Sequence, residues 1–116
     1  MNQLRIFDSR AFLQPADDEP IRSVVTESKD AVVVAWHVKS GQSIKAHVHP
    51  NGQDTWTVLA GTGLYQTDSE GTRKRLKAGD IAVARPGNVH GVQNDGAEPL
   101  IFISVVCPVD AGYELL

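Results

Sequence analysis

The chain of 116 residues lacks several features that mark particular classes of protein. Its single cysteine, Cys107, cannot form an internal disulfide, which is typical of a reducing compartment. The longest apolar run, LIFISVVC at residues 100–107, is far shorter than the roughly 20 residues that span a bilayer. The N-terminal residues MNQLRIFDSR show no basic-then-apolar signal pattern. We therefore expect a cytoplasmic protein with no membrane partner.

An excess of positive charge is also missing. The chain has 11 Lys and Arg against 14 Asp and Glu, a net charge of -3. Because nucleic acids are held mainly by positive surface potential, we expect no nucleic-acid partner. Hydrophobic residues make up 41% of the chain and charged residues 22%, as in an ordinary globular protein. The length suffices for one hydrophobic core, so the sequence predicts a single domain over residues 1–116.

Long helical periods are absent, and short runs rich in β-branched residues occur in their place. The segments between these runs carry the Gly, Pro, Asn or Asp that turns require, as in TDSEG and RPGN. So many strands in a short chain must cover one another's apolar faces, which predicts an all-β fold of packed sheets or a closed barrel. The predicted strands are residues 4–7, 21–26, 31–38, 55–60, 63–67, 72–77, 80–84, 89–94 and 99–106.

The stretch HVHPNGQD at residues 47–54 contains side chains that can bind a metal ion. Side chains two residues apart in an extended segment lie on one face, so His47 and His49 point the same way, and the PNG turn brings Asp54 back towards them. His90, on a later strand, is placed to meet them across a barrel interior. An isolated histidine is usually structural, but three imidazoles and a carboxylate suit a divalent transition metal: Mn, Fe, Ni, Cu or Zn.

Residues 41–61 match the spacing of a known motif. They read Gly41, five residues, His47-Val48-His49, four residues, Asp54, six residues and Gly61. This pattern resembles the first signature motif of the cupin superfamily, and every spacing agrees. Asp54 departs from the family, which usually has Glu at that position.

Residues 79–94 resemble the second cupin motif. Gly79 is followed by five residues, by Arg85, Pro86 and Gly87, and then by His90 and Asn94 at the family's spacing. Arg85 stands where the family usually has Pro. The two motifs cover about half of the chain, and their joint spacing is specific for the superfamily but weak for function, because cupins perform many kinds of chemistry.

The resemblance implies a cupin jelly-roll β-barrel of two antiparallel sheets, similar to the small quercetinase-like type 2 cupins. It implies a metal-dependent enzyme that acts on a small organic molecule, with dioxygenase-type chemistry expected first and isomerase chemistry close behind. A non-catalytic binding or sensing cupin is the alternative. It also implies a homodimer, with the apolar residues 4–7 either exchanged with a neighbour or docked on it.

The resemblance makes His47, His49, Asp54 and His90 the expected metal ligands. Asp54 is one methylene shorter than Glu, so three arrangements stay open: direct ligation, contact through a bridging water, or a metal held by the three histidines alone. Gln53 is a further candidate ligand, although a role in stabilising the turn is the stronger expectation.

Several other side chains have a predicted place. Tyr65 and Arg85 are the candidate catalytic residues, Tyr65 through its hydroxyl and Arg85 by pairing with a substrate carboxylate. A core tyrosine and a surface or ion-paired arginine are the competing interpretations. The remaining predictions are Trp56 as a wall of the pocket, Asn94 as a residue that orients a metal ligand, His37 as an outward-facing structural residue, and Cys107 as a small buried hydrophobe.

Overall fold

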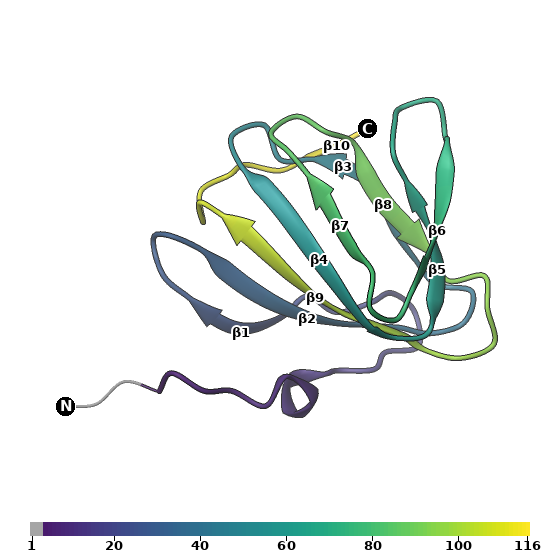
Figure 1. The fold of residues 1–116 in the computed structure, drawn as a ribbon, viewed down its shortest axis with the longest axis horizontal. Coiled ribbons are helices and arrows are strands. Elements are labelled where there is room, and N and C mark those ends of the chain that lie inside the picture. The colour runs from purple at the N-terminus through teal and green to yellow at the C-terminus, as the bar shows by residue number, and fades with distance from the viewer. Residues whose placement is uncertain (1–3) are drawn as a thin grey trace.

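The computed structural model describes residues 4–116 and consists almost entirely of β-strands (Figure 1). Among these residues the regular helical structure is one 3-10 turn, η1, at Ser9–Phe12. No helix in the described part of the chain is long and apolar enough to cross a membrane. The strands are β1 Ser23–Glu27, β2 Val32–Val38, β3 Ser43–Val48, β4 Gln53–Ala60, β5 Thr62–Gln66, β6 Arg73–Lys77, β7 Ile81–Ala84, β8 His90–Gln93, β9 Leu100–Cys107 and β10 Glu114–Leu115.

The strands form two antiparallel sheets that face each other, the jelly-roll architecture expected from the sequence. One five-stranded sheet has the order β1-β2-β9-β4-β7, and the other has the order β10-β3-β8-β5-β6. Neighbours in each sheet are mostly far apart in the chain, as with β2 beside β9 and β3 beside β8. Residues from distant parts of the sequence are therefore brought together between the sheets, which confirms the predicted fold class.

The core lies between the sheets and follows from the alternation of side chains along each strand. Trp36, Phe102 and Val58 are cross-strand partners on β2, β9 and β4, so their side chains share the inner face of one sheet. The indole of Trp56 stacks on the Phe102 ring at 4.1 Å between ring centroids. Buried partners from both sheets complete the cluster: Val38, Tyr65, Leu76, Val92 and Leu100.

Strand β3 contains a bulge that sets the direction of its histidine. Ile44 pairs with Val92 and His47 pairs with His90, so three steps along β3 correspond to two steps along β8. In a regular strand, residues three apart face opposite sides, but the bulge allows Ile44 and His47 both to line the interior. Gly91 makes the bulge possible, because a Cβ there would lie 2.8 Å from the carbonyl oxygen of Ile44.

The structure corrects the predicted strands in three places. Residues 4–7 were expected to form a strand, but they are irregular, and Leu4 and Ile6 are 80% and 92% exposed. A strand needs a hydrogen-bonded neighbour, and this segment lies outside both sheets (Figure 1). Strands β3 and β10 were not predicted.

Cys107 was also predicted wrongly, because it is exposed rather than buried. It ends β9, where Phe102, Ser104 and Val106 face inward, so the alternation turns Cys107 outward. His37 lies on the outer side of β2 by the same alternation, in agreement with the prediction, and is half-buried there.

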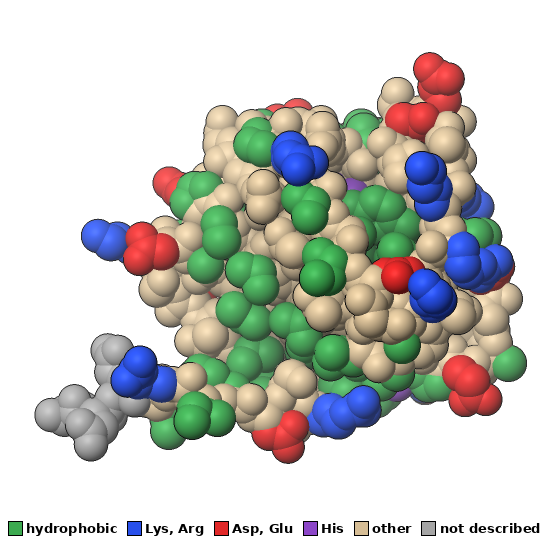
Figure 2. All heavy atoms as spheres, in the orientation of Figure 1, with side chains coloured by type: hydrophobic (Ala, Val, Ile, Leu, Met, Phe, Trp, Pro, Cys, Tyr) green, Lys and Arg blue, Asp and Glu red, His purple; other side chains and the backbone are tan. Residues whose placement is uncertain are grey.

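The outer face of the β1-β2-β9-β4-β7 sheet is unusually apolar. The cross-strand row Ile103, Thr57 and Ile81 lies on this face, and so does the row Val105, Thr55 and Val83. Figure 2 shows hydrophobic side chains across the middle of the visible face, where Figure 1 places β9, β4 and β7. Ile81 is 63% exposed.

Candidate metal centre

Four side chains converge at one end of the barrel interior: His47, His49, Asp54 and His90. Each offers one ligand atom, and these atoms all lie within 4.8 Å of one another. His47 comes from β3, His49 follows that strand directly, Asp54 lies near the start of β4, and His90 begins β8. The structure thus brings together the four residues singled out from the sequence, as a group that could hold a metal ion.

The local strand geometry explains why the histidines meet. His47 and His90 are direct partners in the ladder between β3 and β8, and their ring centroids are 4.1 Å apart. His49, two residues beyond His47, lies on the same side, and its ring centroid is 5.1 Å from each of the other two. The three imidazoles therefore surround one point from three sides.

Asp54 reaches this point despite its short side chain. It is 4% exposed, and its Oδ2 lies 3.0 Å from Nε2 of His90 and 3.3 Å from Nε2 of His49. Ser104, on the neighbouring strand β9, donates a hydrogen bond of 2.6 Å to the other carboxylate oxygen. The carboxylate is therefore held in place with one oxygen directed at the imidazoles.

Backbone carbonyls orient all three imidazole rings. Nδ1 of His47 lies 2.7 Å from the carbonyl oxygen of Lys45, and Nδ1 of His49 lies 2.7 Å from that of Gly112. Nδ1 of His90 lies 3.1 Å from the carbonyl oxygen of Asn88. A carbonyl can only accept, so each Nδ1 must carry the proton that it donates. In a neutral ring this leaves the Nε2 lone pair free to bind a cation.

The contacts of His49 and His90 test whether a cation fits. In both rings Nδ1 faces a carbonyl and Nε2 faces the Asp54 carboxylate, so each ring has an acceptor at both nitrogens. A neutral imidazole can donate only once, so without a cation each ring must take a second proton or leave two acceptors opposed. A cation held by these residues would resolve both conflicts, and the mixed nitrogen and oxygen donors suit a transition metal.

The local electrostatics also favour a bound cation. Burial lowers the pKa of His47 to about 4, so this imidazole is neutral near pH 7. The hydrogen bond with Asp54 raises the pKa of His49. Burial alone would raise the pKa of Asp54, but hydrogen bonds from His49, His90 and Ser104 outweigh it and hold the pKa of this carboxyl far below its usual range. The site therefore presents a buried carboxylate beside a neutral imidazole.

A cavity of about 280 Å³ adjoins this group and is lined by three of its members, His47, His49 and Asp54. Trp56 lines it, in agreement with the sequence-based expectation, and its ring lies edge-on to His90 at 5.8 Å. The rest of the wall is mainly apolar, with Val34, Trp36, Ile44 and Val106. A small molecule with an apolar part would therefore fit beside the metal-binding group.

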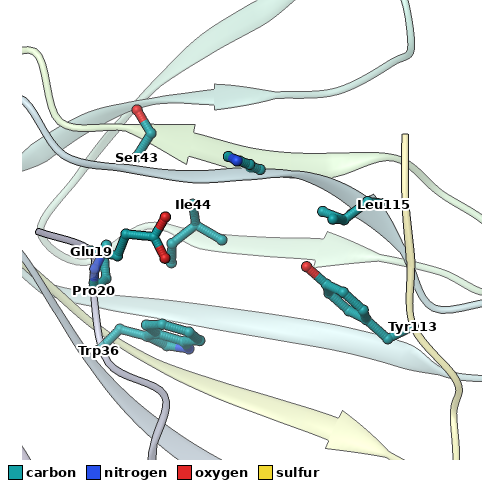
Figure 3. Close-up of a pocket in the computed structure, with 8 residues that line it drawn as sticks. Glu19, Pro20, Trp36, Ser43, Ile44, Tyr113 and Leu115 are labelled. Atoms are coloured by element: carbon teal, nitrogen blue, oxygen red, sulfur yellow. The ribbon is translucent and has the colours of Figure 1, made fainter.

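Three polar residues of the cavity wall were missed in the sequence: Arg22, Ser104 and Tyr113. Tyr113 lies 4.9 Å from His47 between ring centroids. It also borders a second hollow of about 270 Å³, where Figure 3 shows its hydroxyl and the Glu19 carboxylate turned inward near Ile44. No local motif marks these residues, because they come from the segment before β1, from β9 and from the segment before β10.

Neither candidate catalytic residue lines the cavity. Tyr65 is buried in the core, edge-on to Trp56 at 5.2 Å, and burial raises the pKa of its phenol. Arg85 is exposed, because Ala82 and Ala84 face inward and the alternation along β7 turns Arg85 outward. Arg85 also has no part in the ion pairs formed by residues 4–116: Asp80 pairs with Lys77, and Asp54 pairs with the histidines. A carboxylate bound in the cavity would thus lie away from Arg85.

The side chains of Asn94 and Gln53 make hydrogen bonds elsewhere and none with the metal-binding residues. Asn94 is fully buried, donates to the carbonyls of Val38 and Glu98, and accepts a hydrogen bond from the backbone of Gly96. It therefore holds the turn between β8 and β9 and does not orient a metal ligand. Gln53 is exposed and donates to Thr55 at 3.3 Å, outside the cavity.

Comparison with known proteins gives a consistent picture. The family model described as a Cupin domain matches residues 34–106. An uncharacterized conserved protein with a double-stranded beta-helix domain from Klebsiella pneumoniae is 54% identical, with 97% of each chain covered and a TM-score of 0.94. A predicted oxalate decarboxylase from Thermotoga maritima is 19% identical, with 90% of this chain and all (100%) of that chain covered and a TM-score of 0.74.

An oxalate-binding protein of Thermotoga maritima is 29% identical over 66 residues. The match covers 57% of this chain and 53% of that protein, so this chain spans about half the length of the Thermotoga protein. The matched family region, residues 34–106, contains all four residues of the candidate metal centre.

Proposed function

The chain belongs to the cupin family, and we propose that it is a metal-dependent member that acts on a small organic molecule. One divalent transition metal, Mn, Fe, Ni, Cu or Zn, would be held by His47, His49, Asp54 and His90. The observation that carries this proposal concerns the imidazoles of His49 and His90. In each ring both nitrogens face a hydrogen-bond acceptor. The position of Asp54 Oδ2 among the Nε2 atoms supports direct ligation over contact through water.

A metal held there would supply Lewis-acid chemistry towards an oxygen of the ligand, or redox chemistry towards dioxygen if it is redox-active. The chain's own residues prepare the place where this occurs. Carbonyls of Lys45, Gly112 and Asn88 fix the imidazoles, and Ser104 fixes the carboxylate. The apolar walls keep water away from the ligand, which strengthens every electrostatic interaction within the cavity.

The cavity wall bears on the type of reaction. Besides His47, His49 and Asp54, its polar residues are Arg22, Ser104 and Tyr113, and Ser104 is already hydrogen-bonded to Asp54. An isomerase needs a group that moves a proton between two atoms of the substrate, and the wall offers only the Tyr113 phenol for this. Dioxygenase-type chemistry at the metal makes no such demand, so we place it first.

A non-catalytic binding or sensing role is the second candidate. The same scarcity of acid and base groups in the wall favours it. The Thermotoga protein named for binding oxalate supports a small oxygen-rich ligand in either case. The two roles differ in whether a bound ligand is turned over, so product analysis of the metal-loaded protein with a panel of small organic acids under air separates them.

Metal analysis tests the proposal directly. Protein purified without a chelator or a nickel column should contain one transition metal per chain, and the metal-free protein should bind such an ion with micromolar affinity or better. His47→Ala and His49→Ala should each abolish most of this binding, whereas His37→Ala, on the outer side of β2, should leave it unchanged. Equal affinity in all four proteins would refute the metal centre.

We also propose that the chain forms a homodimer through the apolar outer face of the β1-β2-β9-β4-β7 sheet. Contiguous exposed apolar surface of this kind commonly marks an interface. The exposed side chains of Leu4 and Ile6 support the further idea that the N-terminal segment docks on a neighbour. Light scattering should give twice the mass of the chain, and Ile81→Lys should shift it towards the single-chain mass. A wild-type protein of single-chain mass at all concentrations would contradict the dimer.

A further inference from the structure

Arg22 lies at the edge of the metal-binding cavity. It comes directly before β1 and lines the cavity of about 280 Å³ together with His49, Trp56 and Tyr113. It also lines a more open hollow of about 450 Å³ that continues outward past His49 and Tyr113. Its positive charge is close enough to oppose protonation of His49, although the Asp54 contact keeps the pKa of His49 raised overall. Arg22 therefore stands between the metal centre and solvent.

The guanidinium of Arg22 has no acidic partner within residues 4–116. The Lys and Arg ion pairs among residues 4–116 join Lys39 to Asp17, Arg75 to Asp95 and Lys77 to Asp80. Asp54, the buried carboxylate of the cavity, is engaged by His49, His90 and Ser104. The planar guanidinium of Arg22 thus borders the opening of the cavity, and no acidic side chain among residues 4–116 pairs with it. Such a group matches a carboxylate, which it can bind through two parallel hydrogen bonds.

The opposite walls of the cavity have a different character. Trp36 and Trp56 present aromatic rings, and Val34, Ile44 and Val106 add aliphatic surface. A ligand that is charged throughout would lose its hydration against these walls without compensation. A ligand with one anionic group and an apolar body would satisfy both Arg22 and the aromatic walls.

We propose that the ligand of this cavity is a small organic acid with an apolar body, and that Arg22 binds its carboxylate. The body lies against Trp36 and Trp56, which directs the molecule along the cavity towards the four metal-binding residues. The inference deepens the proposed function and rests on it for the identity of the site, but the contact with Arg22 does not require the metal. Arg22 would then determine specificity, because it selects anions over neutral molecules of the same shape.

Calorimetric titration with two matched probes tests this inference. Benzoate and benzamide have the same ring and nearly the same shape, but only benzoate is charged. Acetate and inorganic phosphate carry charge without the ring. Each probe is titrated into the metal-free and the metal-loaded protein, as wild type, Arg22→Gln, Arg22→Lys and Arg85→Gln. Arg85 is the matched control, because it is also an exposed arginine but points away from the cavity.

We expect wild-type protein to bind benzoate at least about tenfold more tightly than benzamide, acetate or phosphate, in both metal states. Arg22→Gln should remove most of the preference over benzamide, Arg22→Lys should keep part of it, and Arg85→Gln should keep all of it. Equal binding of benzoate and benzamide, an Arg22→Gln protein with unchanged benzoate affinity, or no benzoate binding at all would overturn the inference. Phosphate or acetate binding as tight as benzoate would also overturn it, because the apolar body would then contribute nothing.

The same titrations distinguish this inference from the metal proposal. Arg22→Gln should leave metal affinity close to wild type, since Arg22 is not among the four converging residues. If no metal binds but benzoate binding still depends on Arg22, the metal proposal fails and the ligand class stands. If metal binds normally and benzoate affinity ignores Arg22, the ligand class fails and the metal centre stands.

Discussion

The two ends of the barrel interior are built from the same strands but have opposite chemistry. At one end, which we term the open end, His47, His49, Asp54 and His90 meet beside a cavity. The other, which we term the closed end, is filled by Val38, Val58, Val92, Leu100 and Phe102. Strand β4 contributes Asp54 to the first and Val58 to the second, and β8 contributes His90 and Val92 in the same way. A step of two or four residues along one face is enough to change from packing to chemistry.

The ends also differ in what they contribute to stability. The closed end removes apolar surface from water, which is the main favourable term in folding. The open end buries imidazoles and a carboxylate. Buried polar groups of this kind cost stability unless each is hydrogen-bonded or bound to a cation. One end therefore holds the barrel together, and the other depends on that support to keep four ligand atoms in place.

Among single substitutions, loss of Phe102, the largest side chain of the closed end, should have the largest effect on stability. Phe102 is fully buried and stacks on both Trp36 and Trp56. We expect Phe102→Ala to lower the free energy of unfolding by about 3–5 kcal/mol, because it removes buried area and leaves a void. Denaturant titration measures this change. Lys74→Ala, at an exposed position of β6 in the other sheet, should cost about 0.5 kcal/mol or less, and similar losses for both would show that the closed end is not the stabilising region.

Removing a candidate metal ligand at the open end should affect metal binding more than stability. We expect His90→Ala to weaken metal binding by more than about a hundredfold, since loss of a ligand exceeds the usual cost of losing an outer partner. The unfolding free energy of the metal-free protein should fall less than in Phe102→Ala. The two quantities are measured by metal titration and by denaturant titration in the presence of a chelator. A larger stability loss for His90→Ala than for Phe102→Ala would break the division between the ends.

Acid should affect the open end before the closed end. The raised pKa of His49 means that this imidazole takes up a proton at a higher pH than a free one, whose pKa is about 6.5. A metal must displace that proton, whereas His47, with a pKa of about 4, stays neutral and does not compete. Metal affinity should therefore fall by about tenfold or more for each pH unit below the pKa of His49. Competition with a chelator between about pH 8 and pH 5 measures this, and constant affinity over that range would contradict it.

The metal-binding group was accessible from the sequence because its residues lie in two short motifs of recognisable spacing. His47 and His49 share a face by the two-residue period, and the motif spacing places Asp54 and His90 relative to them. Strand β3 was missed because the run SIKAHV is not apolar. Its outer side carries Lys45, so it lacks the hydrophobic signal on which strand prediction depends.

The residues around the metal-binding group could not be predicted, because long-range packing places them. Tyr113 reaches His47 through the pairing of β10 with β3, and Ser104 reaches Asp54 through the pairing of β9 with β4. Arg22 lies in a segment with no motif of its own. Conversely, residues 4–7 have an apolar pattern but no neighbouring strand, so their local signal was misleading.

The bulge in β3 gives this part of the gene a tolerance of length changes that a regular strand lacks. Deleting one codon between Ile44 and His47 would restore a regular ladder opposite β8, in which the two residues stand two apart and still share the inner face. On β4 the ladder with β9 is regular between Asp54 and Val58, so a deletion there would turn Asp54 from the interior to solvent. Every ligand would still be encoded in both cases. In descendants of this sequence we therefore expect single-codon deletions to survive more often between Ile44 and His47 than between Asp54 and Val58.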